Sequence, residues 1–152
     1  MPPKIANIPD EDHVMRHVPW SKLRKDENDN VLGFLPHAFE RRPAEDYLSV
    51  SWVEYYTDPA TRVRDAVWGV RQARAVGGKS AFAIGNVGKI KETCLSAGNA
   101  KVRVVPEPKD DWPAHAGIRR LPRDDLDLLE ALATDAFTEI VLNETIAPQN
   151  KE

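Results

Sequence analysis

The sequence predicts a single α+β domain with a mixed sheet, on three observations. The 152 residues match the usual size of one domain with one core. Hydrophobic residues make up 41% of the chain and charged residues 30%, a composition typical of a folded protein. Strand patterns dominate the first half, and the second half alternates in the order α-β-α-β-β-α. We expect the domain over residues 11–146, with flexible tails at 1–10 and 147–152 because both are polar and contain proline.

Three strand patterns make the first half strand-rich. Residues 13–18 form the first, and residues 20–24 and 31–35 resemble two arms of a hairpin around the polar run 26–30. Residues 47–53 alternate with the period of two that is typical of a half-buried strand. The apolar face of this strand consists of Leu48, Val50 and Trp52.

An amphipathic helix opens the second half. Asp58 and Pro59 predict its start, since they suit the N-cap and first helical positions, and Gly77 predicts its end. The apolar residues at helical spacing are Val63, Ala66, Val67, Val70 and Ala73.

Three elements follow this helix: a strand over residues 80–84, a helix from Asn86 to Gly98 and a strand over residues 101–105. The connecting helix is long enough for a parallel crossover, so we expect a compact β-α-β unit. Cys94 lies on the apolar face of this helix, which predicts a buried and unreactive thiol.

The last elements are a strand over residues 115–119 and a helix from about Arg123. Aspartates in the first turn of this helix suit the helix dipole. Its predicted apolar stripe consists of Leu126, Leu129, Leu132, Ala133, Ala136 and Ile140.

Charge and composition also limit the class of protein. The chain has 21 basic and 24 acidic residues, so no global positive field would draw it onto nucleic acid or an anionic membrane. No apolar run approaches the length of a membrane helix, and the first residues lack a signal pattern. With its single cysteine, the chain is expected to be cytoplasmic.

Three polar residues in apolar segments form the candidate catalytic set: Arg16, Ser49 and His115. Ser49 lacks the Gly-x-Ser-x-Gly elbow of hydrolases, so it is not predicted to be a nucleophile. His115 lies between alanines that would leave its ring accessible as a general base. Arg16 needs an anionic partner, which is either a ligand phosphate or a carboxylate of the chain. If the three converge, they would form a pocket for a nucleotide-like or phosphorylated ligand. The alternative is structural, with a satisfied histidine and a paired arginine.

A partial P-loop pattern suggests a second, ligand-binding site at a strand-to-helix turn, where free amides could bind phosphate. Its candidates are Gly85, Asn86, Gly88 and Lys89. The first glycine and the final Ser or Thr of the motif are replaced by Ala83 and Ile90, so the alternative is a plain capped turn.

A third candidate is a partner-binding surface on the first helix. Trp68 lies roughly opposite the apolar stripe, and an exposed tryptophan beside Arg64 and Arg71 would suit a protein interface. The alternative is that Trp68 packs under the N-terminal segment. His13 and His17 stand too far apart on one strand to share a metal ion, so no metal site is predicted, and no cofactor is expected.

The chain resembles small bacterial proteins that share a layout of Arg, Ala-Phe, Leu-Ser-Val and His-Ala-x-Ile. The matching positions are Arg16 and residues 38–39, 47–50 and 115–118. The resemblance implies a bacterial source and no particular activity. An arginine on an early strand followed by a serine-centred strand is also similar to ADP-ribosyltransferase-like folds. Glu54 is only a neighbour of that strand and does not match their catalytic glutamate.

Two functions follow as expectations. The first is a non-catalytic binding or accessory domain that acts through a protein partner, since no complete catalytic motif is present. The alternative is a small enzyme or sensor that handles a nucleotide-like or phosphorylated anionic ligand through Arg16, Ser49 and His115.

Overall fold

A six-stranded antiparallel sheet is the centre of the computed structural model, which describes residues 7–149. Its strand order is β6-β7-β4-β1-β5-β8, and β2 pairs with β3 in a separate hairpin. The strands are β1 (His13–Val18), β2 (Leu23–Lys25), β3 (Val31–Phe34), β4 (Tyr47–Trp52), β5 (Ala81–Asn86), β6 (Arg103–Pro106), β7 (His115–Arg119) and β8 (Glu139–Leu142). The helices are α1 (Arg62–Ala73), α2 (Val87–Gly98) and α3 (Leu126–Ala131). The predicted α+β class and strand-rich first half are confirmed.

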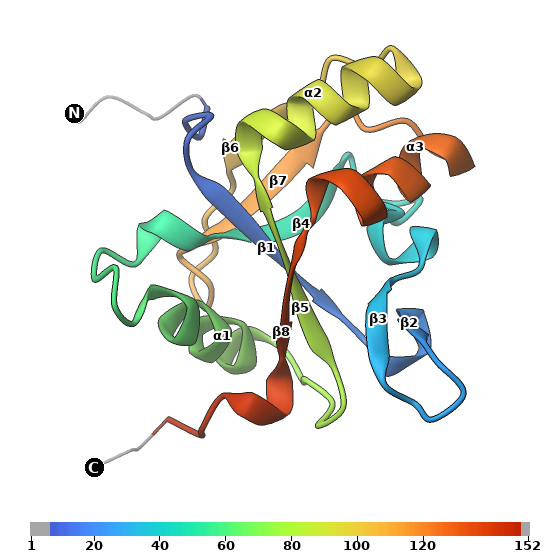
Figure 1. The fold of residues 1–152 in the computed structure, drawn as a ribbon. Coiled ribbons are helices and arrows are strands. Elements are labelled where there is room, and N and C mark those ends of the chain that lie inside the picture. Colours follow the sequence, from blue (N-terminus) through green and yellow to red (C-terminus); the bar gives the residue numbers. More distant parts are fainter. Residues whose placement is uncertain (1–6, 150–152) are drawn as a thin grey trace, which may run out of the picture.

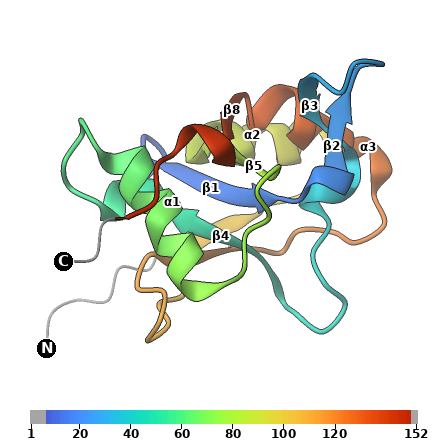
Figure 2. The same cartoon turned by 90° about the horizontal axis from the view of Figure 1, so that it is seen from below.

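Each face of the sheet carries its own core. Figures 1 and 2 show α2 and α3 on one side of the sheet and α1 on the other. Because side chains alternate along a strand, β5 contributes to both cores. Ala81 and Ala83 pack with α2 and α3, whereas Phe82 and Ile84 pack with α1. The sheet is therefore the middle of three layers.

The expected parallel β-α-β unit and the mixed sheet are wrong. β5 and β6 run in the same direction, but β7, β4 and β1 lie between them. All neighbouring strands within residues 7–149 pair antiparallel. The reason is that β1 pairs with β5 over its whole length, which occupies the edge that a parallel neighbour would need.

The first helix begins later than the predicted start at Asp58 and Pro59. Asp58 instead organises a turn, since its Oδ1 accepts from the amide of Ala60 at 3.0 Å and its carbonyl accepts from the amide of Thr61. α1 starts after Thr61, whose hydroxyl donates to Asp65.

α2 begins and packs as predicted. Asn86 caps it, because its Oδ1 accepts from the amide of Lys89 at 2.9 Å. Cys94 is fully buried on the inner face of α2, and burial raises the pKa of its thiol to about 12. The predicted unreactive thiol is consistent with this environment.

The last helix is shorter than its predicted apolar stripe. A π-helical turn over Leu132–Ala136 follows α3, and the amide of Phe137 donates to the carbonyl of Leu132. The wider turn breaks the 3.6-residue period, so the chain leaves the helix and enters β8. Two members of the predicted stripe do not belong to it. Leu126 is 57% exposed, and Ile140 lies in β8, a strand that the sequence pattern did not predict.

The chain before β1 packs against the domain. Ile8, expected in a flexible tail, is buried, and its amide donates to the carbonyl of Val104 at 2.8 Å. The domain boundary therefore lies before Ile8; residues 1–6 of the expected tail lie outside the described residues. Within residues 7–149, no helix has the length and apolar character to cross a membrane.

Candidate functional site

A gap in the sheet begins where β1 and β4 separate. Two residue pairs join β1 to β4, ending at Met15, whereas six pairs join β1 to β5. Arg16 bridges the strands beyond that point. Its Nη1 donates to the carbonyl of Ser49 at 2.7 Å, and its Nε donates to the carbonyl of Ala38 at 2.6 Å. The guanidinium takes the place of a strand amide in bonding Ser49.

Arg16 has no carboxylate partner in the part of the chain that the structure describes. The expected pairing with a carboxylate of the chain is therefore wrong, because two backbone carbonyls bind the guanidinium instead. Burial lowers the pKa of Arg16 to about 10, the positive charges of Arg74 and Arg42 contribute to the decrease, and the negative charge of Glu45 acts against it without forming an ion pair. A partly buried cation without a counter-ion favours the binding of an anion.

An open cavity of about 450 Å³ lies beside Arg16. Ligand sites are typically roughly 300–1,000 Å³, so the cavity has room for a small molecule. Its lining includes three carboxylates and six cationic side chains, which are Arg16, Lys22, Arg41, Arg42, Arg74 and Lys109. No ion pair within residues 7–149 joins these two sets of groups. The cavity is thus locally positive, although the chain carries a net charge of −3.

His17 adds a polar group without a partner to the cavity wall. Its Nε2 is buried and makes no hydrogen bond to the described residues. Burial lowers the pKa of His17 to about 4, and the charges of Arg74 and Arg16 act in the same direction. The imidazole is therefore neutral near pH 7, and its unbonded Nε2 lies beneath the cavity surface.

Ser49 and His115 form a hydrogen-bonded pair at the same cavity. Ser49 lies in its lining, and its Oγ is 2.7 Å from Nε2 of His115. The Nδ1 of His115 is 2.7 Å from the carbonyl oxygen of Glu107, which can only accept, so Nδ1 carries a hydrogen. Burial lowers the pKa of His115 and favours the neutral ring. In that state Nε2 accepts the hydroxyl hydrogen of Ser49.

The sheet register explains how the two side chains meet. His115 pairs with Ser51 across the β4–β7 ladder, while Ser49 pairs with Gly117. Both side chains lie on the same face of the sheet in this register, so the imidazole reaches diagonally to Ser49. A Cβ on Gly117 would lie 2.8 Å from the ring of Tyr47, so a larger residue would displace that ring.

The structure therefore connects all three predicted catalytic candidates, Arg16, Ser49 and His115, through two hydrogen bonds. The expected accessibility of His115 is wrong. It is 1% exposed, because the ring of Trp112 lies 4.6 Å and that of Tyr47 lies 5.7 Å from its own, centroid to centroid. His115 can act on a ligand only through Ser49.

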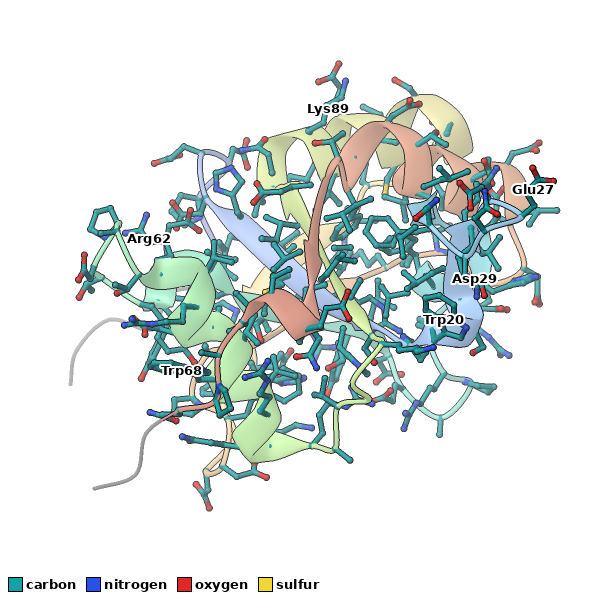
Figure 3. All side chains as sticks on the ribbon, turned by 60° about the horizontal axis from the view of Figure 1, so that its bottom comes forward. Trp20, Glu27, Asp29, Arg62, Trp68 and Lys89 are labelled. Carbon is teal, nitrogen blue, oxygen red and sulfur yellow. The ribbon has the colours of Figure 1, made fainter. Side chains whose placement is uncertain are left out.

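The predicted phosphate loop lies away from this cavity, at the start of α2. The backbone amides of this turn are already bonded: that of Gly88 donates to the carbonyl of Asp10, and that of Lys89 donates to Asn86. Gly85 serves packing, because a Cβ there would lie 2.9 Å from the carbonyl oxygen of Ala136. Lys89 points away from the molecule (Figure 3). This arrangement corresponds to the capped-turn alternative.

The predicted partner-binding residues contact the chain's own C-terminal segment. The indole of Trp68 donates to the carbonyl of Ala147 at 2.8 Å, and Figure 3 shows Trp68 on α1 near that segment. Arg71 donates to Asn143 and to the carbonyls of Ile146 and Ala147. Trp68 therefore packs under the C-terminal segment; residues 1–6 of the N-terminal segment, its other expected neighbour, lie outside the described residues. Arg64 stacks on the indole at 4.4 Å and remains the exposed member of the set.

Several residues of the cavity were not predicted as site residues, notably His17, Arg42 and Arg74. The sequence contains one usable signal, the adjacent arginines Arg41 and Arg42, which lie in the loop before the serine-centred strand. Arg74 carries no such signal, because it comes to the cavity from the end of α1.

Metal ligands do not cluster in the described part of the chain: no group of three or more His, Cys, Asp or Glu residues there could hold an ion. Comparisons of the chain with family models, curated proteins and solved structures find no match.

Proposed function

We propose that the protein binds a small anionic ligand, nucleotide-like or phosphorylated, in the cavity beside Arg16. The observation that carries this function is the guanidinium of Arg16, which has no carboxylate partner among residues 7–149 and lies in the wall of a cavity with other cations. Arginine suits phosphate oxygens, because its planar fork donates several hydrogen bonds in a fixed geometry.

The anchoring of Arg16 supports this function. Two of its hydrogen bonds, to Ala38 and Ser49, fix the plane of the guanidinium before a ligand arrives. A side chain that is already ordered loses less conformational entropy on binding. Arg42 and Arg74 supply additional positive charge from a loop and a helix end, where they can adjust to ligands of different size.

Titration of inorganic phosphate and of AMP, followed by calorimetry, tests the proposal, with uncharged adenosine as the control ligand. The variants are Arg42→Ala and Arg74→Ala, because neither side chain makes a hydrogen bond in the described residues and their loss should not affect folding. Each should weaken phosphate binding about fivefold, since a partly solvated charge pair contributes about 1 kcal/mol. Arg16→Ala should abolish binding.

Arg64→Ala is the matched control, because Arg64 is an exposed arginine of α1 that does not line the cavity. Its phosphate affinity should equal that of the wild type. Equal affinity in the Arg42→Ala, Arg74→Ala and Arg64→Ala variants would contradict the proposal, as would a wild-type protein that binds adenosine and AMP equally well.

A protein partner remains the second expected function. It has less support, because Trp68 and Arg71 are engaged with the chain's own C-terminal segment. Native mass spectrometry of the protein purified gently from its own host separates the two functions. A retained small anion supports the cavity function, whereas a stoichiometric second polypeptide supports the accessory-domain function.

A further inference from the structure

The hydroxyl hydrogen of Ser49 points away from the cavity. Nδ1 of His115 must donate to the carbonyl of Glu107, so Nε2 of the neutral ring takes the hydrogen of Ser49. The lone pairs of Oγ remain for the cavity that Ser49 lines. A serine that only bound an anion would donate its hydrogen to that anion. This serine instead presents an oxygen with electron pairs beside a positively charged surface.

On the basis of the proposed anion site, we infer that Ser49 is a nucleophile that accepts a phosphoryl group from the bound ligand, with His115 as its general base. A nucleophile within 2.6–3.2 Å of a base that is itself oriented by a third group is the usual arrangement for covalent catalysis. Here the third group is the backbone carbonyl of Glu107, which positions His115 and fixes its tautomer.

Ser51 shows what a purely structural serine looks like on the same strand. Its side chain is buried, and its Oγ accepts a hydrogen bond from the indole of Trp112 at 2.8 Å. It has no hydrogen bond to a base and does not line the cavity. The two serines lie on the same face of β4, but only Ser49 combines a base with access to the cavity.

The charge of the cavity indicates the substrate class. In phosphoryl transfer, negative charge on the transferred group is stabilised by positioned cations, which often are arginines. Arg16 bonds the carbonyl of Ser49 itself, so its charge lies next to the attacking residue. A phosphate monoester or phosphoanhydride fits this surface better than a neutral acyl ester.

The reaction balances with the groups present and water. Oγ of Ser49 forms a bond to phosphorus as the bond from phosphorus to the leaving oxygen breaks. Nε2 of His115 takes the hydroxyl proton, and the leaving oxygen takes a proton from solvent and departs as an alcohol or phosphate. Water then attacks phosphorus from the side opposite Oγ and loses a proton to solvent, while His115 returns its proton to Oγ, which restores Ser49 and releases inorganic phosphate.

A fluorophosphonate tests the nucleophile, because it forms a stable phosphonyl ester with an activated serine and releases fluoride. Intact mass and peptide mapping should show one adduct on Ser49 in the wild type. Ser49→Ala should show none, and Ser51→Ala should react like the wild type. His115→Ala should react at least about 100-fold more slowly, which is the lower end of general-base contributions. Circular dichroism checks that each variant is folded.

Hydrolysis of p-nitrophenyl phosphate and p-nitrophenyl acetate tests the substrate class. Faster turnover of the phosphate, lost in Ser49→Ala, supports phosphoryl transfer, whereas faster turnover of the acetate overturns it. A wild-type protein that gives no fluorophosphonate adduct on Ser49 overturns the nucleophile. If phosphate binding still depends on Arg42 and Arg74 in that case, the proposed anion site is supported and only the nucleophilic role of Ser49 is rejected. If phosphate does not bind, the proposed function itself fails.

Discussion

Arg16 shows how one residue can join structure and ligand binding. Its guanidinium replaces a strand amide at the carbonyl of Ser49, and this is possible because β1 and β4 separate there. The same separation opens the cavity that Arg16 lines. A cation that had been paired with a carboxylate would have lost most of its attraction for an external anion.

The pH dependence of stability can be predicted for His17, whose pKa is lowered from 6.5 to about 4 by burial and by the charges of Arg74 and Arg16. Between these values the unfolded chain binds a proton that the folded chain does not. The free energy of unfolding should therefore fall as pH falls through this window, by at most about 3 kcal/mol from this group. Below about pH 4 its contribution is fully lost.

Urea unfolding at pH 7 and pH 4.5 measures this effect in the wild type and in His17→Gln. The variant should lose less stability between the two pH values. Some pH dependence should remain, because burial also lowers the pKa of His115. The same loss in both proteins would show that His17 is not buried in its neutral form.

At the scale of elements, the C-terminal segment depends on α1. Arg71 holds it through hydrogen bonds to the side chain and carbonyl of Asn143 and to the carbonyls of Ile146 and Ala147. This segment continues directly from β8, which is an edge strand of the sheet. Arg71 thereby ties an edge of the sheet to the helix on its face.

Arg71→Ala should lower the free energy of unfolding by about 1–3 kcal/mol, because several carbonyls lose a charged donor together. Hydrogen exchange should increase at residues 143–147. Arg64→Ala is the control on the same helix. It should cost less than about 1 kcal/mol, since its ion pair with Asp65 is exposed and its stacking on Trp68 is modest. Equal effects of the two variants would contradict this role of Arg71.

At the scale of the whole molecule, Cys94 reports on opening of the core. It is the single cysteine, it is fully buried, and burial raises the pKa of its thiol to about 12. A thiol reagent at pH 8 should label the native protein at least about a thousandfold more slowly than the urea-unfolded chain, because the thiol reacts only after unfolding. Absorbance of the released chromophore measures the rate. Rapid labelling of the native protein would show that α2 opens independently of the core.

The sheet itself organises the whole molecule around β1. This strand pairs with β5 over its full length and with β4 over part of it, so the chain's first strand lies at the centre of the sheet. Strand neighbours are decided by contacts across the molecule, which explains why a crossover of suitable length did not indicate a parallel pair.

Local sequence patterns predicted those elements whose structure depends on residues close together in the chain. β1 and β7 have their predicted bounds, and Asn86 caps α2, because strand alternation and capping depend on neighbours in the sequence. The three catalytic candidates were also named from their settings, as polar residues within apolar segments. Ile140 was misplaced because a π-helical turn after α3 interrupts an otherwise regular pattern, whereas Leu126 is exposed at the start of α3.

Only the tertiary structure decided how the site is built. His115 bonds Ser49 across 66 positions of sequence, because the register of β4 and β7 places the two side chains diagonally on one face of the sheet. The carbonyl partners of Arg16 and the cations that surround it come from loops and helix ends whose composition is ordinary. Such contacts depend on how distant segments fold together, so no local pattern of residues can specify them.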